Sequence, residues 1–191
     1  VGPAVPVGGG TVAVAVTGYA QRLPGALALL THAQDAVSGV PLERWDVELD
    51  DASSPARFGS YICDVAGFDV VSFGLAMNEA VLMDPQQRML LESVWEVLDV
   101  SRVGSAERSR TAVLVGISGS EYGRMSDGVS AFSATGGALS VASGRLSYVY
   151  GLQGPSMSVD TACSSSLVAT HLGAGGVASR ESPAAVVCGV N

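Results

Sequence analysis

The chain has 191 residues, with 10 basic and 18 acidic side chains and a formal net charge of −8. Every basic residue is arginine, and this acidic balance argues against nucleic acid or an anionic membrane as the main partner. At 48% apolar and 15% charged, the chain can bury a sizeable core, while three cysteines and two histidines are too few for a disulfide framework or a structural zinc site. We therefore expect a cytoplasmic protein.

The first third of the chain predicts four segments. Residues 1–10 are rich in Gly and Pro and are expected to form a flexible leader. Residues 11–18, TVAVAVTG, predict a strand buried on both faces. The run over 24–37 predicts a helix. Residues 41–69 hold seven of the 18 acids and predict a polar, turn-rich surface insertion.

A helix start follows with a clear signature. Asp84 is in position to cap the helix, Pro85 suits its first turn, and Gln87 stands three residues after the cap, as in a capping box. The helix that follows is predicted to have a wide buried face, because apolar residues stand at positions 89, 90, 91, 94, 95, 97 and 98.

The remaining segments alternate between strands and helices. Residues 111–118 predict a second buried strand, and the Gly/Ala/Ser-rich stretch 133–151 suits tightly packed helices. The last third predicts a strand over 155–161, a turn and helix over 162–179, and a strand over 183–191. This alternation predicts an α/β layered fold. No phosphate-binding motif of the GxGxxG or GxxxxGK[ST] type occurs in the sequence.

Cys163 is the residue best placed for chemistry. It lies between a predicted strand and the helix that follows, where the partial positive charge of a helix N-terminus stabilises a thiolate. Backbone N–H groups of a first helical turn can receive a developing oxyanion. The residues beside Cys163 are small and leave room for a substrate at the thiol: Ala162, Ser164, Ser165 and Ser166. On position alone, a small buried cysteine remains an open reading.

The other cysteines and the histidines are poorer candidates. Cys188 lies in an apolar strand and Cys63 in the acidic insertion, so both are expected to be structural. His171 stands eight residues beyond Cys163, about 12 Å along a helix, and is expected to be packed or capped. His32 has no neighbours that suggest chemistry. The sequence thus offers a nucleophile and no visible base.

Four segments together carry a resemblance to a known family. The run 144–172, GRLSYVYGLQGPSMSVDTACSSSLVATHL, resembles the active-site region of polyketide synthase β-ketoacyl synthases. The run 73–99, with MDPQQR, is similar to that family's signature helix. PLERWD at 41–46 and CGVN at 188–191 resemble two further elements, in the right order and spacing.

The resemblance implies a thiolase-like layered fold, with 11–191 as the N-terminal βαβαβ part of a ketosynthase domain. It implies that Cys163 accepts an acyl chain from the phosphopantetheine of an acyl carrier protein. A decarboxylative Claisen condensation with a malonyl-type extender would follow. No cofactor is expected to bind directly. The partners implied are the carrier protein, a second copy in a homodimer with the interface at about 155–160, and the C-terminal half in cis or as a separate chain.

Three departures from the family pattern qualify this resemblance. TGYAQRLPG at 17–25 lacks the cysteine that many relatives carry there, and SFG at 72–74 with Asn78-Glu79 replaces FFG and an Arg-Glu pair. The family's two histidines and lysine belong to later elements that these residues do not include, so we expect no condensation by this chain alone. Two alternatives stay open: a non-catalytic fragment or split subunit serving assembly, and a thiolase or chalcone-synthase-like enzyme using coenzyme A thioesters.

Overall fold

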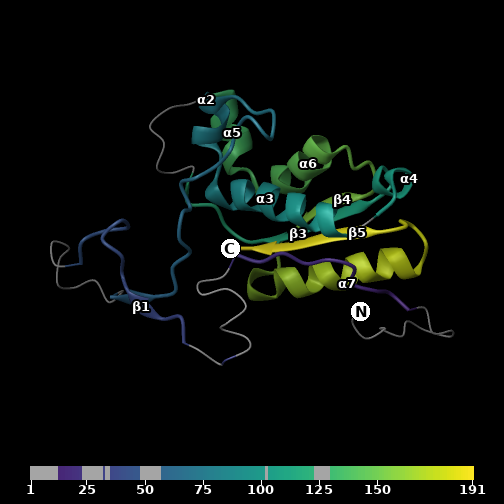
Figure 1. Ribbon diagram of the computed structural model, residues 1–191, viewed down its shortest axis with the longest axis horizontal. Coiled ribbons are helices and arrows are strands. Elements are labelled where there is room, and N and C mark those ends of the chain that lie inside the picture. Colours follow the sequence, from purple (N-terminus) through teal and green to yellow (C-terminus); the bar gives the residue numbers. More distant parts are fainter. Residues whose placement is uncertain (1–12, 23–31, 33–34, 48–56, 102, 123–129) are drawn as a thin grey trace. The chain divides into compact units, whose positions relative to one another are not determined.

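The computed structural model describes residues 13–22, 32, 35–47, 57–101, 103–122 and 130–191, shown in colour in Figure 1. The chain divides into two compact units. The larger unit consists of Val1–Ala20 and Phe68–Asn191, and the smaller unit is Gln21–Gly67. The predicted leader over 1–10 lies outside the described residues.

The smaller unit is largely irregular where it is described, as its polar sequence predicts. Strand β1, Ser38–Gly39, pairs antiparallel with β2, Phe58–Gly59. Trp45 meets Tyr61 edge to face, with ring centroids 6.3 Å apart. Most of the helix predicted over 24–37 lies outside the described residues, although His32 is helical.

A parallel three-stranded sheet forms the centre of the larger unit (Figure 1). Strand β3, Ala112–Ile117, lies between β4, Ser156–Val159, and β5, Ala185–Val190. All six residues of β3 are buried, which the continuous apolar run of its sequence predicts. The expected α/β architecture and the three strands of the later chain are therefore confirmed.

Helices cover both faces of this sheet. Helix α7, Ser165–Ala178, packs on β3 and β5 from one side, while α3, Pro85–Val100, and α6, Leu139–Tyr150, pack on the other (Figure 1). The main core lies between the sheet and α3 and α6, and includes Leu91, Val94, Val113, Val115 and Leu146.

Three shorter α-helices also lie among the described residues of the larger unit. They are α2, Met77–Leu82, α4, Ser105–Arg108, and α5, Ala131–Gly137. Helix α2 packs against α5. Helices α5 and α6 together confirm the prediction of packed helices over 133–151.

The start of α3 follows the prediction in one respect and departs from it in another. The Asp84 carboxylate accepts a hydrogen bond from the Gln86 backbone N–H at 2.8 Å, and Pro85 occupies the first turn. Gln87 does not close a capping box, because the Asp84 N–H donates to the Gly136 carbonyl at 3.1 Å and Gln87 Oε1 accepts from Arg145 instead. The Gln87 amide nitrogen donates to the Gly136 carbonyl at 2.8 Å. On the same helix Trp95 is 58% exposed, so the buried face is narrower than predicted.

The strand predicted over 11–18 is wrong in its described part. Residues 13–20 form neither helix nor strand, and Val16 is 68% exposed. A strand needs a ladder partner, and among the described residues the sheet holds only β4, β3 and β5, none of which pairs with 13–18. Gly18 instead lies beside the end of α3, where an added Cβ would stand 3.0 Å from Val100 Cγ2.

No helix among the residues that the structure describes combines the length and the apolar character needed to cross a membrane.

Candidate functional site

Cys163 lies at a sharp turn between a strand and a helix. Strand β4 ends at Val159, a single 3₁₀ turn covers Ala162–Ser164, and α7 begins at Ser165. Cys163 is exposed. The predicted strand–turn–helix position of this cysteine is therefore what the backbone adopts, and its thiol is open to a reactant rather than enclosed in the core.

The carboxyl ends of the three parallel strands meet at the same edge of the sheet as Cys163. Ser118 follows β3 and Asn191 follows β5, and the Ser118 hydroxyl donates to Asn191 Oδ1 at 3.2 Å. Ligand sites of parallel sheets usually form at this edge, because each strand delivers a loop there. The edge is thus the natural place for chemistry in this fold.

Two glycines let the start of α7 approach the sheet closely. A Cβ on Gly116 of β3 would lie 2.5 Å from the Ser165 carbonyl carbon and the Ser166 nitrogen. A Cβ on Gly189 of β5 would lie 2.5 Å from Ser166 Cβ. Only glycine permits both approaches, so these two positions set the distance between the central strands and the turn that carries Cys163.

The residue before Cys163 has an unusual backbone conformation. Ala162 has φ +56°, in the left-handed region that side chains with a Cβ rarely adopt. The Asp160 carboxylate accepts a hydrogen bond from the Ala162 N–H at 3.0 Å, which closes a short Asx-type turn over residues 160–162, just before Cys163. The chain reverses within these few residues and presents Cys163 at its outer side.

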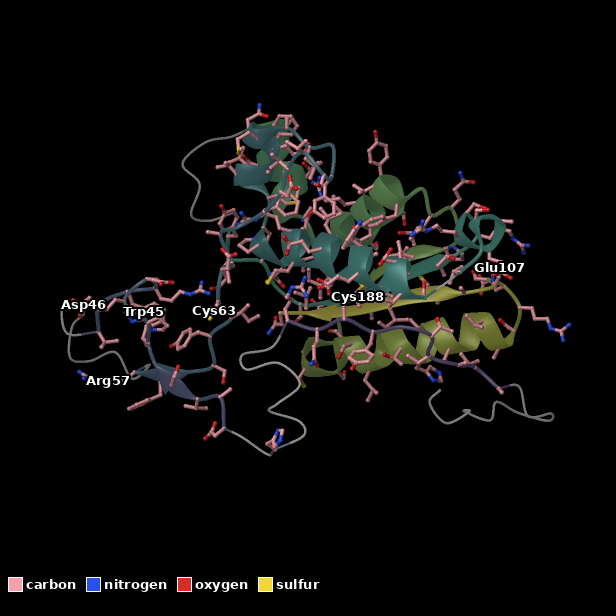
Figure 2. The ribbon with its side chains drawn as sticks, in the orientation of Figure 1. Trp45, Asp46, Arg57, Cys63, Glu107 and Cys188 are labelled. Atoms are coloured by element: carbon pink, nitrogen blue, oxygen red, sulfur yellow. The ribbon has the colours of Figure 1, made fainter. Side chains whose placement is uncertain are left out.

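The other two cysteines have different surroundings (Figure 2). Cys188 on β5 packs against the main core, and burial raises the pKa of its thiol to about 12. A thiol held neutral in this way is a poor nucleophile, in agreement with the structural role expected for Cys188. Cys63 is exposed in the smaller unit, where it follows the irregular segment after β2.

The histidines do not supply a packed partner for the cysteine. His171, expected to be packed or capped, lies on α7 and is exposed, so the packed alternative is wrong. The small residues of α7 explain this, because the helix turns Ala169 and Gly173 toward the sheet and leaves His171 outside. His32 is also exposed. In the described parts of the chain, no three His, Cys, Asp or Glu side chains gather in a way that could hold a metal.

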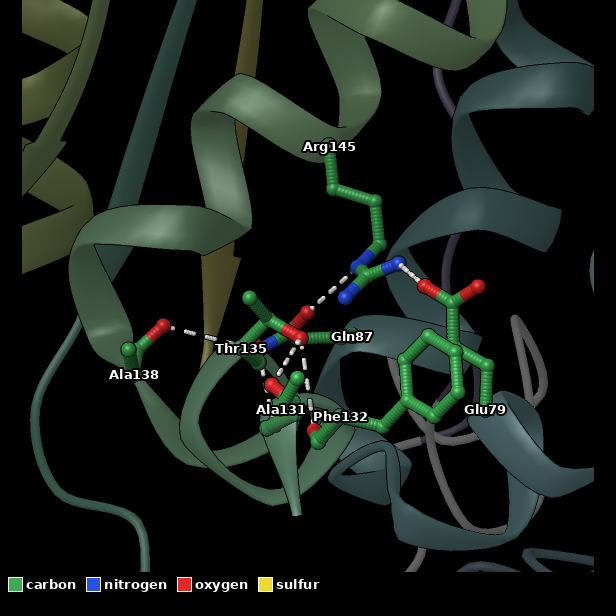
Figure 3. Close-up of polar contacts among 8 residues, drawn as sticks. Glu79, Gln87, Ala131, Phe132, Thr135, Ala138 and Arg145 are labelled. Atoms are coloured by element: carbon green, nitrogen blue, oxygen red, sulfur yellow. Dashed lines mark hydrogen bonds and ion pairs between the residues drawn. The ribbon is translucent and has the colours of Figure 1, made fainter.

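A polar cluster that the sequence did not reveal joins four helices (Figure 3). Arg145 of α6 pairs with Glu79 of α2 at 2.5 Å and donates through Nε to Gln87 Oε1 at 2.8 Å. The Gln87 amide nitrogen in turn donates to carbonyls at the end of α5. Glu79 and Gln87 lie in the same run, 73–99, but Arg145 comes 58 residues after Gln87, so no local spacing reveals the cluster.

Residues 11–191 match the family described as Beta-ketoacyl synthase, N-terminal domain. The chain is 43% identical to a phenolphthiocerol/phthiocerol polyketide synthase of Mycobacterium tuberculosis over 93% of its own length. It is 41% identical to an erythronolide synthase of Saccharopolyspora erythraea over 92% of its length. It spans only 13% and 6% of these two proteins.

Solved ketosynthases share the fold. The ketosynthase from module 6 of the bacillaene synthase of Bacillus subtilis superposes with a TM-score of 0.79 and 32% identity, over 92% of this chain and 31% of that one. An oxazolomycin ketosynthase domain of Streptomyces albus gives a TM-score of 0.78 and 32% identity, over 92% of this chain and 33% of that one. The sheet and its helices therefore form an incomplete thiolase-like α/β fold.

Proposed function

Because the chain belongs to the β-ketoacyl synthase family, we propose that it serves polyketide chain elongation, with Cys163 as the residue that accepts the acyl chain. The proposed reaction is acyl transfer followed by decarboxylative Claisen condensation on carrier-protein thioesters. The chain would form the N-terminal part of the ketosynthase domain, over residues 11–191.

One observation carries this proposal. Cys163 is exposed at the turn that leads into α7, at the carboxyl edge of a parallel sheet. A helix N-terminus stabilises negative charge, both on a thiolate and on the oxyanion that forms when the thiolate attacks a carbonyl. Among the three cysteines, Cys188 is disfavoured because burial raises the pKa of its thiol to about 12.

The first step, transfer of the acyl group to Cys163, needs no cofactor. The Cys163 thiolate attacks the carbonyl carbon of an acyl group held as a phosphopantetheine thioester. The tetrahedral intermediate collapses with cleavage of the old carbon–sulfur bond, and the phosphopantetheine thiolate leaves and takes up a proton. The acyl group now sits on Cys163 as a new thioester. Covalent capture of this kind divides chain transfer and chain extension into two steps.

The second step extends the chain. A malonyl-type extender on the carrier protein loses carbon dioxide, and the resulting carbanion attacks the carbonyl of the acyl-Cys163 thioester. The cysteine leaves as a thiolate, and the product is a β-ketoacyl thioester on the carrier, two backbone carbons longer. This step needs imidazole groups that stabilise the enolate, and we propose that these come from the C-terminal half of the domain, in cis or on a separate chain.

The partners follow from this chemistry. We propose an acyl carrier protein as the donor of both thioesters and a second copy of the ketosynthase as a dimer partner. Strand β4 is an edge strand of the described sheet, and Met157 on it is 44% exposed, which supports an interface there. With three free cysteines, a reducing compartment such as the cytoplasm suits the protein.

The test uses the protein as expressed from its own gene, with an acyl group presented on the phosphopantetheine of a carrier protein. We expect the mass of the peptide with Cys163 to rise by one acyl group, and Cys163→Ala to abolish this change. The matched control, Cys188→Ala, should still be acylated. Wild-type protein that stays unacylated would favour the assembly role, and faster acylation from a coenzyme A thioester would favour the thiolase or chalcone-synthase alternative.

A further inference from the structure

The turn that presents Cys163 is held in place by side chains around it. Ala162 adopts φ +56°, and a residue with a Cβ keeps this conformation only where its surroundings enforce it. The contacts that enforce it come from both sides of the turn. One is the Asp160 carboxylate, which accepts from the Ala162 N–H at 3.0 Å.

Ser165 makes two of these contacts. Its hydroxyl oxygen accepts a hydrogen bond from the Thr161 N–H at 2.8 Å and donates to the Ala162 carbonyl at 2.7 Å. The Ala162 carbonyl belongs to the peptide group that joins Ala162 to Cys163. One hydroxyl therefore bridges the backbone on both sides of the left-handed residue and fixes the peptide on which Cys163 stands.

Ser165 is itself firmly anchored. It is only 5% exposed, whereas Cys163 and Ser164 on the same turn are exposed. Its backbone lies against Gly116 of β3, where an added Cβ would stand 2.5 Å from the Ser165 carbonyl carbon. The Ser165 hydroxyl therefore joins the turn to a residue whose backbone packs directly on the central strand β3.

We infer that Ser165 is a positioning residue for the reaction of Cys163. It acts through the turn rather than on the substrate: its hydroxyl keeps Ala162 left-handed, and this sets the direction in which the Cys163 thiol meets an acyl thioester. The inference rests on the proposed function, because it assigns a role within that acyl transfer.

The decisive variant is Ser165→Ala, which removes both hydrogen bonds and keeps the Cβ. Attack on a thioester carbonyl demands a defined approach, and a displacement of about 1 Å can slow a reaction roughly 100-fold. We expect the rate constant of Cys163 acylation to fall by roughly 10- to 100-fold, with little change in the concentration of acyl carrier that half-saturates the reaction. Iodoacetamide, a small reagent with weaker orientational demand, should alkylate Cys163 within about threefold of the wild-type rate.

Two further variants separate positioning from general stability. Ser165→Thr keeps the hydroxyl and should restore most of the acylation rate. Ser179→Ala removes a serine hydrogen bond to the Gly176 carbonyl at the far end of α7 and should leave the rate unchanged. A folding defect would instead expose Cys188 to iodoacetamide, which the measurement of all three cysteines detects.

Hydrogen exchange at the Thr161 amide tests the bridge directly. In Ser165→Ala we expect this amide to exchange at least about tenfold faster, because its acceptor is gone. Faster exchange together with slower acylation supports the inference. Faster exchange with an unchanged acylation rate overturns it, and so does unchanged exchange. A wild-type protein that is never acylated at Cys163 refutes the proposed function first, and the inference with it.

Discussion

Arg145 on α6 and Glu79 on α2 form an ion pair with 2.5 Å between Nη1 and Oε1, although 66 residues separate them in the chain. The Arg145 side chain is 8% exposed and that of Glu79 is 21% exposed. Through Nε, Arg145 also orders Gln87 on α3 (Figure 3). This one guanidinium therefore connects three helices on the same side of the sheet.

Replacing Arg145 with Met should destabilise the protein strongly. The substitution removes the cation and leaves the Glu79 carboxylate and the Gln87 oxygen without it in a partly buried place, which costs roughly 2–4 kcal/mol. Urea unfolding measures the loss. Adding Glu79→Gln should recover part of it, and Arg110→Met, at an exposed arginine, should change stability by less than about 0.5 kcal/mol. An Arg145→Met protein as stable as the wild type would contradict the prediction.

Gly116→Ala should force α7 away from the sheet. The new methyl group would meet backbone atoms of Ser165 and Ser166 at 2.5 Å, and backbone cannot rotate aside as a side chain can. We expect a loss of about 1–3 kcal/mol in the free energy of unfolding, together with slower acylation of Cys163.

The matched control for Gly116→Ala is Gly175→Ala. Gly175 lies within α7, and its added Cβ would meet nothing within 4 Å. This variant should gain about 0.5–1 kcal/mol, since alanine favours a helix over glycine. If both variants lose stability equally, close approach at Gly116 is not the cause.

Replacing Asp84 with Ala should lower the stability of the protein more than replacing it with Asn. Its carboxylate caps α3 and also accepts from the Ser120 hydroxyl at 2.6 Å, which ties the loop after β3 to the helix. Asp84→Ala should cost about 1–2 kcal/mol, whereas Asp84→Asn keeps a capping oxygen and should cost less. Thermal unfolding of the two variants side by side provides the measurement.

Stability should decline at alkaline pH through Cys188. Burial raises the pKa of this thiol from 9.0 to about 12, so the folded protein keeps a proton that the unfolded chain releases. The contribution of the buried thiol to the free energy of unfolding is complete below pH 9. It is lost as the pH rises toward 12, because the unfolded state binds fewer protons than the folded state in that window. Between pH 8 and 10 the thiol should remove on the order of 1 kcal/mol from the free energy of unfolding.

Cys188→Ala isolates this effect. The variant has its own packing loss at every pH, but its free energy of unfolding should fall less between pH 8 and pH 10. Burial also raises the pKa of Tyr150, but both proteins carry this tyrosine, so its contribution cancels in the comparison. Identical pH slopes for the variant and the wild type would rule out the thiol as the source.

The sequence predicted the later two thirds of the fold well. The apolar run of β3, the capped start of α3 and the strand–turn–helix around Cys163 are local patterns, and each carries its own signal over fewer than about 20 residues. The family resemblance, confirmed by the match over 11–191, came from the same segments.

What the sequence could not predict depends on distant partners. The run 11–18 has strand propensity, but no described residue pairs with 13–18, so propensity alone was misleading. Gln87 looked like part of a capping box and instead bonds to carbonyls about 50 residues away. The bridging role of Ser165 was equally hidden, since its residue type indicated only a small neighbour for the cysteine.

The pairing of β3 with β5 brings together segments 73 residues apart, from Ala112 and Ala185 to Ile117 and Val190. Gly116 and Gly189, against which the start of α7 packs, lie in these two strands, so the close approach of α7 to the sheet is complete only after β5 has joined β3. Contacts of such long separation slow folding, because the entropy of loop closure must be overcome before they form. We therefore expect the start of α7 to reach its native position on the sheet only in a chain in which β5 has paired with β3.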